Sequence, residues 1–468
     1  MKKTLMMGAV VAVLVIAPAH AQQPATLEQV LRELQALNQR VSKLEQEKDQ
    51  LAAQNAELAA KNDRLEATTE YLRSNASATR KEMAEDSPKI DEADRITKAS
   101  EWASRISFKG DVRFRNETID QEFVDANRNR DRIRLRAGMV AKVNDTVTAE
   151  IQLTTDENLS GGSDGDARSS NRTLTDANSR KEIDIDLGYI QWAPNADFRA
   201  TFGKMRYPWV RPAISLFFDN DINPEGAALS WQMGTNGLFA SAFYFDLAER
   251  ALMADSNMAG GQIGWRSDIG KSTRFTVAAS YFDHNAVQGY NAVQDGNIAN
   301  AFGNTTSTTT CRPTITACIA SDFDVMQGMA ELIFTVANRP LTFFAEYAQN
   351  DAAEVNPVTG DKLDSAYAAG IFFGRVSAPR SWEVGYLYQE IENDALYGQW
   401  IDSDFAGGTT GSKGSVFRLG FGFSRNFRIN ATYFLNDTNI DLPATIPVVG
   451  PVLDREYKRL QLDLVASF

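Results

Sequence analysis

The sequence is poor in histidine, which limits the kinds of catalysis open to it. It has two histidines, and His20 lies in the leader described below, so His284 alone remains. Catalysis by an activated serine needs a base held beside it, and His-Glu-x-x-His does not occur. We therefore predict no enzyme, no cofactor and no metal site, and we interpret His284 as a solvated residue of an external loop.

Long apolar runs and excess positive charge are also missing. Beyond the leader, no apolar stretch reaches the roughly 18 residues that a membrane-spanning helix needs. The mean hydropathy is -0.33, and acidic residues outnumber basic ones by 61 to 48, which gives a net charge of -13. This acidic balance argues against nucleic acid as a partner.

The first residues predict export. Lys2 and Lys3 precede an apolar run, and Ala19-His20-Ala21 forms a small-residue cleavage site, so residues 1–21 are predicted to be a signal peptide. The chain has two cysteines, Cys311 and Cys318, and both lie in one polar stretch. In an exported protein such a pair is typical of a local disulfide.

A heptad repeat follows between residues 27 and 72 and predicts a coiled coil. Its d positions are all apolar: Val30, Leu37, Leu44, Leu51, Leu58, Leu65 and Leu72. The a positions become polar toward the C-terminal half, where they include Lys48, Asn55 and Asn62. We expect residues 73–104 to form a charged linker without regular structure.

The remaining residues, 105–468, are expected to form an all-β transmembrane barrel. In the last segment Leu460, Leu462 and Leu464 alternate with polar residues, as in a strand with one apolar face. This pattern recurs about sixteen times in segments of the length that antiparallel transmembrane strands have. The expected strands are 106–116, 130–142, 146–155, 182–192, 198–206, 226–233, 237–246, 259–267, 273–283, 324–336, 340–349, 365–376, 381–390, 414–424, 427–436 and 456–468. Between Tyr189 and Trp192 the apolar face changes parity, which predicts a bulge or a strand end.

Connections between these segments alternate short and long. Short periplasmic turns and long external loops are typical of outer-membrane barrels. The chain ends on Phe468, and this aromatic end resembles the C-terminal signal of outer-membrane proteins. We therefore expect the barrel in the outer membrane and the coiled coil in the periplasm.

Basic residues gather on the expected lumenal face of four strands near the closing point of the barrel. We name this set the basic wall: Lys109, Arg113, Arg115, Arg132, Arg134, Arg136, Arg418 and Arg428. Arginine and lysine rows favour anions in a pore. The alternative is that these cations pair with lumenal acids: Asp111, Glu150, Asp184, Asp186, Glu346 and Asp463.

The connection from Tyr207 to Glu225 is too apolar for a freely solvated loop. Packing inside the barrel would bury it and narrow the lumen, with Asp219, Asp221 and Glu225 facing the basic wall as a constriction. Packing over a neighbouring protomer is the alternative.

These features together resemble the Putative porin family of Gram-negative outer membranes, which is related in layout to phosphate-selective porins. The segments 203–209, Gly-Lys-Met-Arg-Tyr-Pro-Trp, and 219–227, Asp-Asn-Asp-Ile-Asn-Pro-Glu-Gly-Ala, resemble that family's third-loop region. The resemblance implies a homotrimer in outer-membrane lipid that passes small hydrophilic solutes or ions by passive diffusion. The competing hypothesis is a structural protein whose coil contacts peptidoglycan and tethers the membrane to the cell wall.

Overall fold

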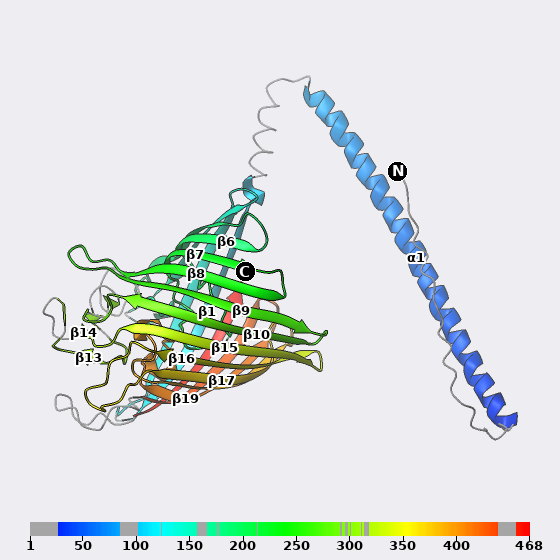
Figure 1. Cartoon of the computed structure of the whole chain (residues 1–468). Helices are drawn as coiled ribbons and strands as arrows, with labels where there is room; N and C mark the ends of the chain where they lie inside the picture. The colour runs from blue at the N-terminus through cyan, green and yellow to red at the C-terminus, as the bar shows by residue number, and fades with distance from the viewer. Residues whose placement is uncertain are drawn as a thin grey trace. The chain divides into compact units, whose positions relative to one another are not determined.

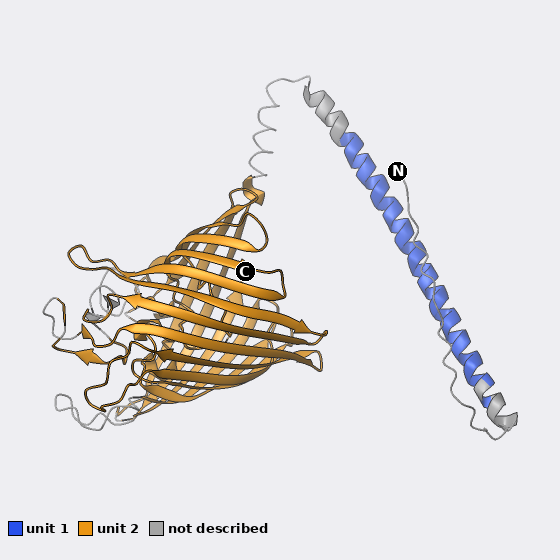
Figure 2. Ribbon diagram, in the orientation of Figure 1, with its two compact units in different colours: residues 1–99 blue, residues 100–468 orange. Residues whose placement is uncertain are grey.

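The structure is a computed structural model that describes residues 27–84, 102–122, 124–156, 166–175, 177–212, 214–290, 293–294, 298–299, 301–309, 311–312, 318–438 and 455–468. The expected signal peptide lies outside these residues. The chain divides into two compact units, residues 1–99 and 100–468 (Figure 2). Each unit is described by itself below.

In the first unit, the described residues form the helix α1 (Leu27–Ala84). It continues past Leu72, so residues 73–84 are helical and not the irregular linker that we expected. The apolar heptad ends there, but alanine, arginine, lysine and glutamate keep the helix propensity high until Pro88 approaches. The d-position leucines are exposed in the single chain, with Leu37 at 62% and Leu51 at 59%. No described helix is both long and apolar enough to cross a membrane.

The second unit is a closed antiparallel barrel (Figure 1). Its sheet has 17 strands, of which the two-residue β4 (Arg172–Thr173) pairs only with β2, so sixteen strands form the wall. This confirms the predicted fold. The wall strands are β1 (Ile106–Gln121), β2 (Arg128–Lys142), β3 (Val147–Thr155), β5 (Ile183–Trp192), β6 (Phe198–Lys204), β7 (Glu225–Gln232), β8 (Gly237–Ala248), β9 (Ser256–Ile269), β10 (Thr273–Asn285), β15 (Phe323–Val336), β16 (Arg339–Asn350), β17 (Ser365–Gly374), β18 (Trp382–Ile391), β19 (Ser412–Gly422), β20 (Phe427–Thr438) and β21 (Arg455–Ser467).

The barrel closes where β1 pairs with β21, and we call this pairing the seam. The register places Arg115 opposite Asp463 and Thr118 opposite Leu460. Backbone hydrogen bonds of 3.0 Å also join Gly110 to Phe468 in both directions. Closure leaves no strand edge unpaired, which a sheet in hydrocarbon requires.

A bulge in β5 accounts for the change of parity, although it lies at Asp186 and not between Tyr189 and Trp192, where we expected it. Gln152 of β3 pairs with Leu187, whereas the next residue, Leu153, pairs with Ile185. Asp186 is therefore the extra residue, and it turns the strand so that Ile185 and Trp192 both lie on the exposed face.

Burial in the wall is inverted relative to a soluble protein. In β21, Leu460, Leu462 and Leu464 are 38%, 41% and 39% exposed, whereas Gln461 and Asp463 are 2% and 6% exposed. A soluble sheet would bury the leucines, because exposed apolar area in water is unfavourable. The outward face is therefore built for lipid, and the inward face carries the polar groups.

Short turns gather at one end of the barrel and long connections at the other. The shortest turn contains Ala337 and Asn338, whose φ angles of 50° and 60° match a type I′ hairpin. The long connections are 156–182, 205–224, 286–322, 351–364, 392–411 and 439–454. β1 begins at the short-turn end of the barrel, and β21 ends there. Two-residue strands also lie within the 286–322 connection: β11 (Val293–Gln294), β12 (Ile298–Ala299), β13 (Thr306–Ser307) and β14 (Cys318–Ile319).

Replacing a central outward residue of β21 with a charge tests the inverted burial. Leu462→Arg should destabilise the barrel by about 2–4 kcal/mol, because the guanidinium would face hydrocarbon. The measurement is denaturant unfolding of the protein refolded in lipid vesicles. Leu462→Phe, which keeps the position apolar, is the control. An arginine variant as stable as the phenylalanine variant would contradict a lipid-facing β21.

Candidate functional site

Arginines face each other across the first strand pair of the barrel. The register sets Arg113 opposite Arg134 and Arg115 opposite Arg132. Their side chains point inward, because Phe114, of the other parity, is exposed on the outward face. Directly opposed like charges repel, so this arrangement requires anions nearby.

Most of the basic wall is paired, as the alternative interpretation held. Five of its members form ion pairs: Lys109–Glu150 at 2.7 Å, Arg115–Asp463 at 2.7 Å, Arg132–Glu117 at 4.0 Å, Arg134–Asp111 at 2.6 Å and Arg136–Asp221 at 2.7 Å. Arg113 donates to the side-chain oxygen of Asn171. For Arg418 and Arg428, no ion pair occurs among the described residues. Three members therefore lack an ion pair with any described residue, and because Arg113 is held by Asn171, Arg418 and Arg428 remain as the two unpaired arginines.

The connection 205–224 packs inside the barrel. Trp209, Phe217 and Phe218 are buried, and the Trp209 ring lies 4.8 Å from that of Phe243 and 5.1 Å from that of Phe282, which are inward residues of β8 and β10. The apolar side chains of this loop pack against aromatic side chains on the lumenal face of the barrel. The loop therefore fills part of the barrel interior.

The three acids expected on this loop do not share one environment. Asp221 contacts the basic wall through Arg136 and also accepts hydrogen bonds of 2.9 and 2.7 Å from the Ser170 backbone and hydroxyl. Asp219 instead accepts a hydrogen bond of 2.7 Å from the backbone of Ser403. Glu225 does not face the wall: it begins β7, shares parity with the exposed Leu229 and pairs with Lys204 at 2.7 Å. The expectation for Glu225 is corrected, because strand parity sends it outward.

A second connection, 392–411, also folds into the barrel, and sequence reasoning missed it. It contains two short 3-10 helices, η1 (Gly398–Trp400) and η2 (Phe405–Gly407). Trp400 stacks near Trp209 with ring centroids 6.5 Å apart, and its carbonyl accepts a hydrogen bond of 2.8 Å from the Asp219 backbone. We expected an external loop here. Its buried Leu396, Trp400 and Phe405 carried the same apolar signal as the third loop.

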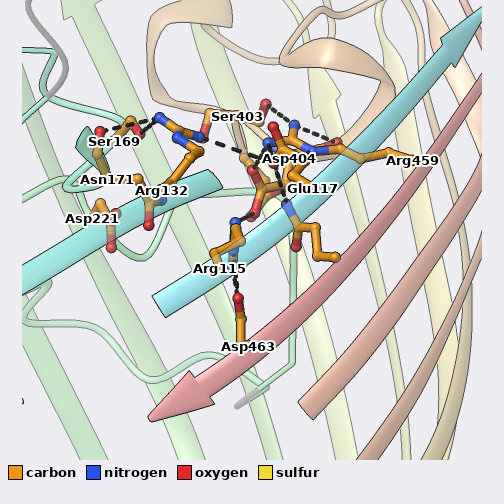
Figure 3. Close-up of polar contacts among 12 residues, drawn as sticks. Arg115, Glu117, Arg132, Ser169, Asn171, Asp221, Ser403, Asp404, Arg459 and Asp463 are labelled. Carbon is orange, nitrogen blue, oxygen red and sulfur yellow. Dashed lines mark hydrogen bonds and ion pairs between the residues drawn. The ribbon is translucent and has the colours of Figure 1, made fainter. Parts of the chain in front are cut away.

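The tip of this second loop meets the seam (Figure 3). The Asp404 carboxylate contacts Arg115 of β1 at 3.0 Å and Arg459 of β21 at 2.7 Å. Arg459 also donates to Glu117 at 2.9 Å, and Gln461 donates to the same carboxylate oxygen at 3.2 Å. Arg459 and Glu117 had lumenal parity in the sequence, whereas nothing in the sequence pointed to Asp404.

Three acids of the two loops differ in their pKa shifts. Burial alone would raise the pKa of Asp221, but Arg136, Arg134 and Arg113 outweigh burial and hold it below its usual range. Burial, followed by the nearby Asp402, raises the pKa of Asp219 well above its usual value. Burial and the charge of Asp404 raise the pKa of Asp402 to about 6. Contact with arginine therefore favours the ionised form of Asp221, whereas burial shifts Asp219 and Asp402 toward the protonated form.

Two polar cavities lie beside these loops. The larger, of about 370 Å³, is lined by Arg113, Arg134, Arg136, Arg418, Arg428 and Asp221, among others. The smaller, of about 250 Å³, lies nearer the long-connection end and is lined by Arg128, Arg130, Arg132 and Arg459. Both cavities are bordered by Arg168, Ser403 and Asp404. Such an arrangement can hold small hydrated anions.

Other predicted positions have simpler outcomes. His284 is not solvated: it lies at the end of β10, is buried, and its ring contacts the Phe323 carbonyl at 3.0 Å. Cys311 and Cys318 form a disulfide. Within the described part of the chain, no cluster of three or more metal-ligating side chains occurs.

Comparison with known proteins gives a family and a fold. The sequence matches the family described as Putative porin over residues 120–318 and 292–468. OprB of Pseudomonas putida is similar in structure, with 11% identity and a TM-score of 0.50 over 79% of this chain and 96% of that one. OmpF of Salmonella typhi, solved with daunomycin, has 11% identity and a TM-score of 0.44 over 78% and 97%. OmpT, an outer membrane protein of Vibrio cholerae solved as a trimer, has 14% identity and a TM-score of 0.41 over 78% and 99%. None of the curated proteins matches.

Acidification should strengthen the contact between the two loops. A carboxyl whose pKa is raised from 3.8 to about 6 by burial stabilises the docked loops most at low pH, and this contribution is lost as pH rises through about 6. Recordings in planar bilayers should therefore show fewer open–closed transitions at pH 5 than at pH 7.

Asp402→Asn should reduce this pH dependence, because its amide does not titrate in this range. Asp246→Asn, at an exposed position near the end of β8, is the matched control. Equal pH dependence in the two variants would show that Asp402 does not control loop docking.

Proposed function

We propose that this chain, which belongs to the Putative porin family, is an outer-membrane porin for passive diffusion of small hydrophilic solutes or ions, with a preference for anions. The observation that carries the proposal is a barrel with an apolar outward face and charged cavities in its lumen. A lumen of this kind offers water and ions a path across hydrocarbon.

The preference for anions rests on the balance of unpaired charge. Asp221, Asp404 and Asp463 all contact arginines, so their charge is compensated. Arg418 and Arg428 line the larger cavity and form no ion pair with any described residue. Their charge should attract anions, and this effect should weaken in high salt.

The short-turn end of the barrel is the proposed periplasmic end, as in outer-membrane barrels generally. Because the first barrel strand begins at that end, the preceding helix would lie in the periplasm. This proposal assigns residues 1–21 to a signal peptide, α1 to a periplasmic coil and residues 105–468 to the membrane. A coil in the periplasm would also be able to contact peptidoglycan.

The exposed leucines of α1 favour association with other copies of the helix, and we propose that the assembly is a homotrimer. A stripe of d-position leucines on one 58-residue helix is unfavourable in water unless helices of other copies cover it. Polar a positions, such as Asn55 and Asn62, would fix the register of such a coiled coil.

Leu51→Glu should therefore disrupt the trimer, because it would bury three carboxylates at one d layer. Analytical ultracentrifugation in detergent measures the oligomeric state. Asp49→Glu, which lies beside the heptad core on an exposed position, should leave it unchanged. A Leu51→Glu protein with wild-type mass would show that the coil does not hold the subunits together.

A second candidate function is structural. Residues of connections 205–224 and 392–411 pack together inside the lumen, as they would in a membrane plug whose coil tethers the envelope to peptidoglycan. Single-channel recording separates the two functions. Discrete conductance steps support the porin, whereas their absence at all voltages would favour the tether.

The anion preference has a direct test in the two unpaired arginines. Arg418→Gln with Arg428→Gln should shift the zero-current potential under a salt gradient toward cation selectivity. Arg274→Gln, which removes an exposed cation paired with Asp268 near the end of the barrel, is the control. An unchanged potential in the double variant would remove these arginines from the selectivity element.

A further inference from the structure

The Asp404 carboxylate lies between two guanidinium groups, as the oxyanion of a bound ligand would. Its two oxygens contact different guanidinium groups, Oδ2 with Arg115 at 3.0 Å and Oδ1 with Arg459 at 2.7 Å (Figure 3). The two arginines come from opposite sides of the seam and are nearly fully buried. Charge-assisted pairs of this kind are the strong hydrogen bonds that arginine forms with carboxylates and phosphates.

Asp404 is not part of the barrel wall. It precedes a turn in which Ala406, Gly407 and Gly408 have φ angles of 50°, 73° and 81°. The loop therefore delivers the carboxylate from the interior of the barrel to a wall that already has its own acids.

The wall arginines keep partners when Asp404 is left aside. Arg115 donates through Nε and Nη2 to Asp463 at 2.7 and 2.9 Å, and Arg459 donates through Nε to Glu117 at 2.9 Å. The Nη1 group of Arg115 is directed at the place that the Asp404 carboxylate occupies, and so is the Nη2 group of Arg459, which also donates to Glu117. Two positioned donors without Asp404 would form a site for another oxyanion.

The location of this site fits a path along the arginines. Asp404 borders both lumenal cavities, one with Arg113, Arg134 and Arg136 and the other with Arg130 and Arg132. An anion moving along the basic residues from one cavity to the other would pass the place where Asp404 is bound.

We propose that the Arg115–Arg459 pair is a binding station for a solute carboxylate or phosphate, and that Asp404 is a tethered competitor that occupies it. This inference rests on the proposed porin function. The solute oxyanion takes the place of the Asp404 carboxylate between the two guanidinium groups, and the carboxylate returns when the solute leaves. Competition keeps binding weak enough for release, which conduction requires.

The competitor is charged at neutral pH. Burial alone would raise the pKa of Asp404, but Arg459 and Arg115 outweigh burial and hold it well below its usual range. Mild acid therefore does not release Asp404 from the station, and only substitution or a competing anion does.

Block of chloride current by added oxyanion tests the proposal in the full-length protein. Inorganic phosphate and acetate are the probes, and the concentration of each that halves the current is compared in planar bilayers. For Asp404→Asn this concentration should fall at least about tenfold, because a charged competitor is removed. Asp404→Glu should remain near wild type, and Asp246→Asn is the control for the change in net charge.

The outcomes separate this inference from the porin function. Conducting Asp404→Asn channels with the same half-blocking concentrations as Asp246→Asn would overturn the competitor while leaving the porin intact. Wild-type protein without conductance would overturn the porin itself. Tighter block by phosphate alone would assign the station to phosphate groups, and tighter block by both probes to oxyanions in general. Asp404→Ser replaces the asparagine variant if that variant does not refold.

Discussion

The pairing of β1 with β21 is the constraint on which the rest of the barrel depends. In hydrocarbon an open sheet would leave a row of backbone groups without hydrogen bonds, so the first and last strands must meet. The same pairing brings Arg115, Glu117, Arg459 and Asp463 together on the lumenal side. Closure of the backbone and assembly of the contacts across the seam are therefore one event, because Arg115 reaches Asp463, and Arg459 reaches Glu117, only when the two strands meet.

The loops inside the lumen both cover its aromatic side chains and place acids beside its arginines. Their aromatic residues cover inward Phe243 and Phe282, which would otherwise face water. Their acids, Asp221 and Asp404, add a further carboxylate to arginines that already contact acids of the wall. Apolar packing between the loops fixes where these acids lie, so the electrostatics of the lumen depend on hydrophobic contacts between connections that are far apart in the sequence.

The wall was predictable from sequence, and the lumen was predictable only in part. Alternation along each strand depends on one face meeting lipid, and this pattern identified every wall strand and the parity of Arg113 and Arg134. The apolar residues of 205–224 also showed that this loop needs burial. The same reasoning did not extend to 392–411, although Leu396 and Trp400 carry the same signal. The position of Asp404 depends on how two loops pack against each other, and no local periodicity reports such packing.

The choice of a loop acid at the seam also has a physical reason. An acid fixed in a strand, such as Asp463, cannot leave the lumenal face without breaking backbone pairing. A loop acid such as Asp404 can move with its segment while the barrel remains closed. Wall acids such as Asp463 therefore neutralise the arginines permanently, whereas the loop acid Asp404 can leave them and return. A lumen that must hold charge in a membrane and still admit solutes needs both kinds of anion, because buried arginines without partners are costly and fully paired arginines bind nothing else.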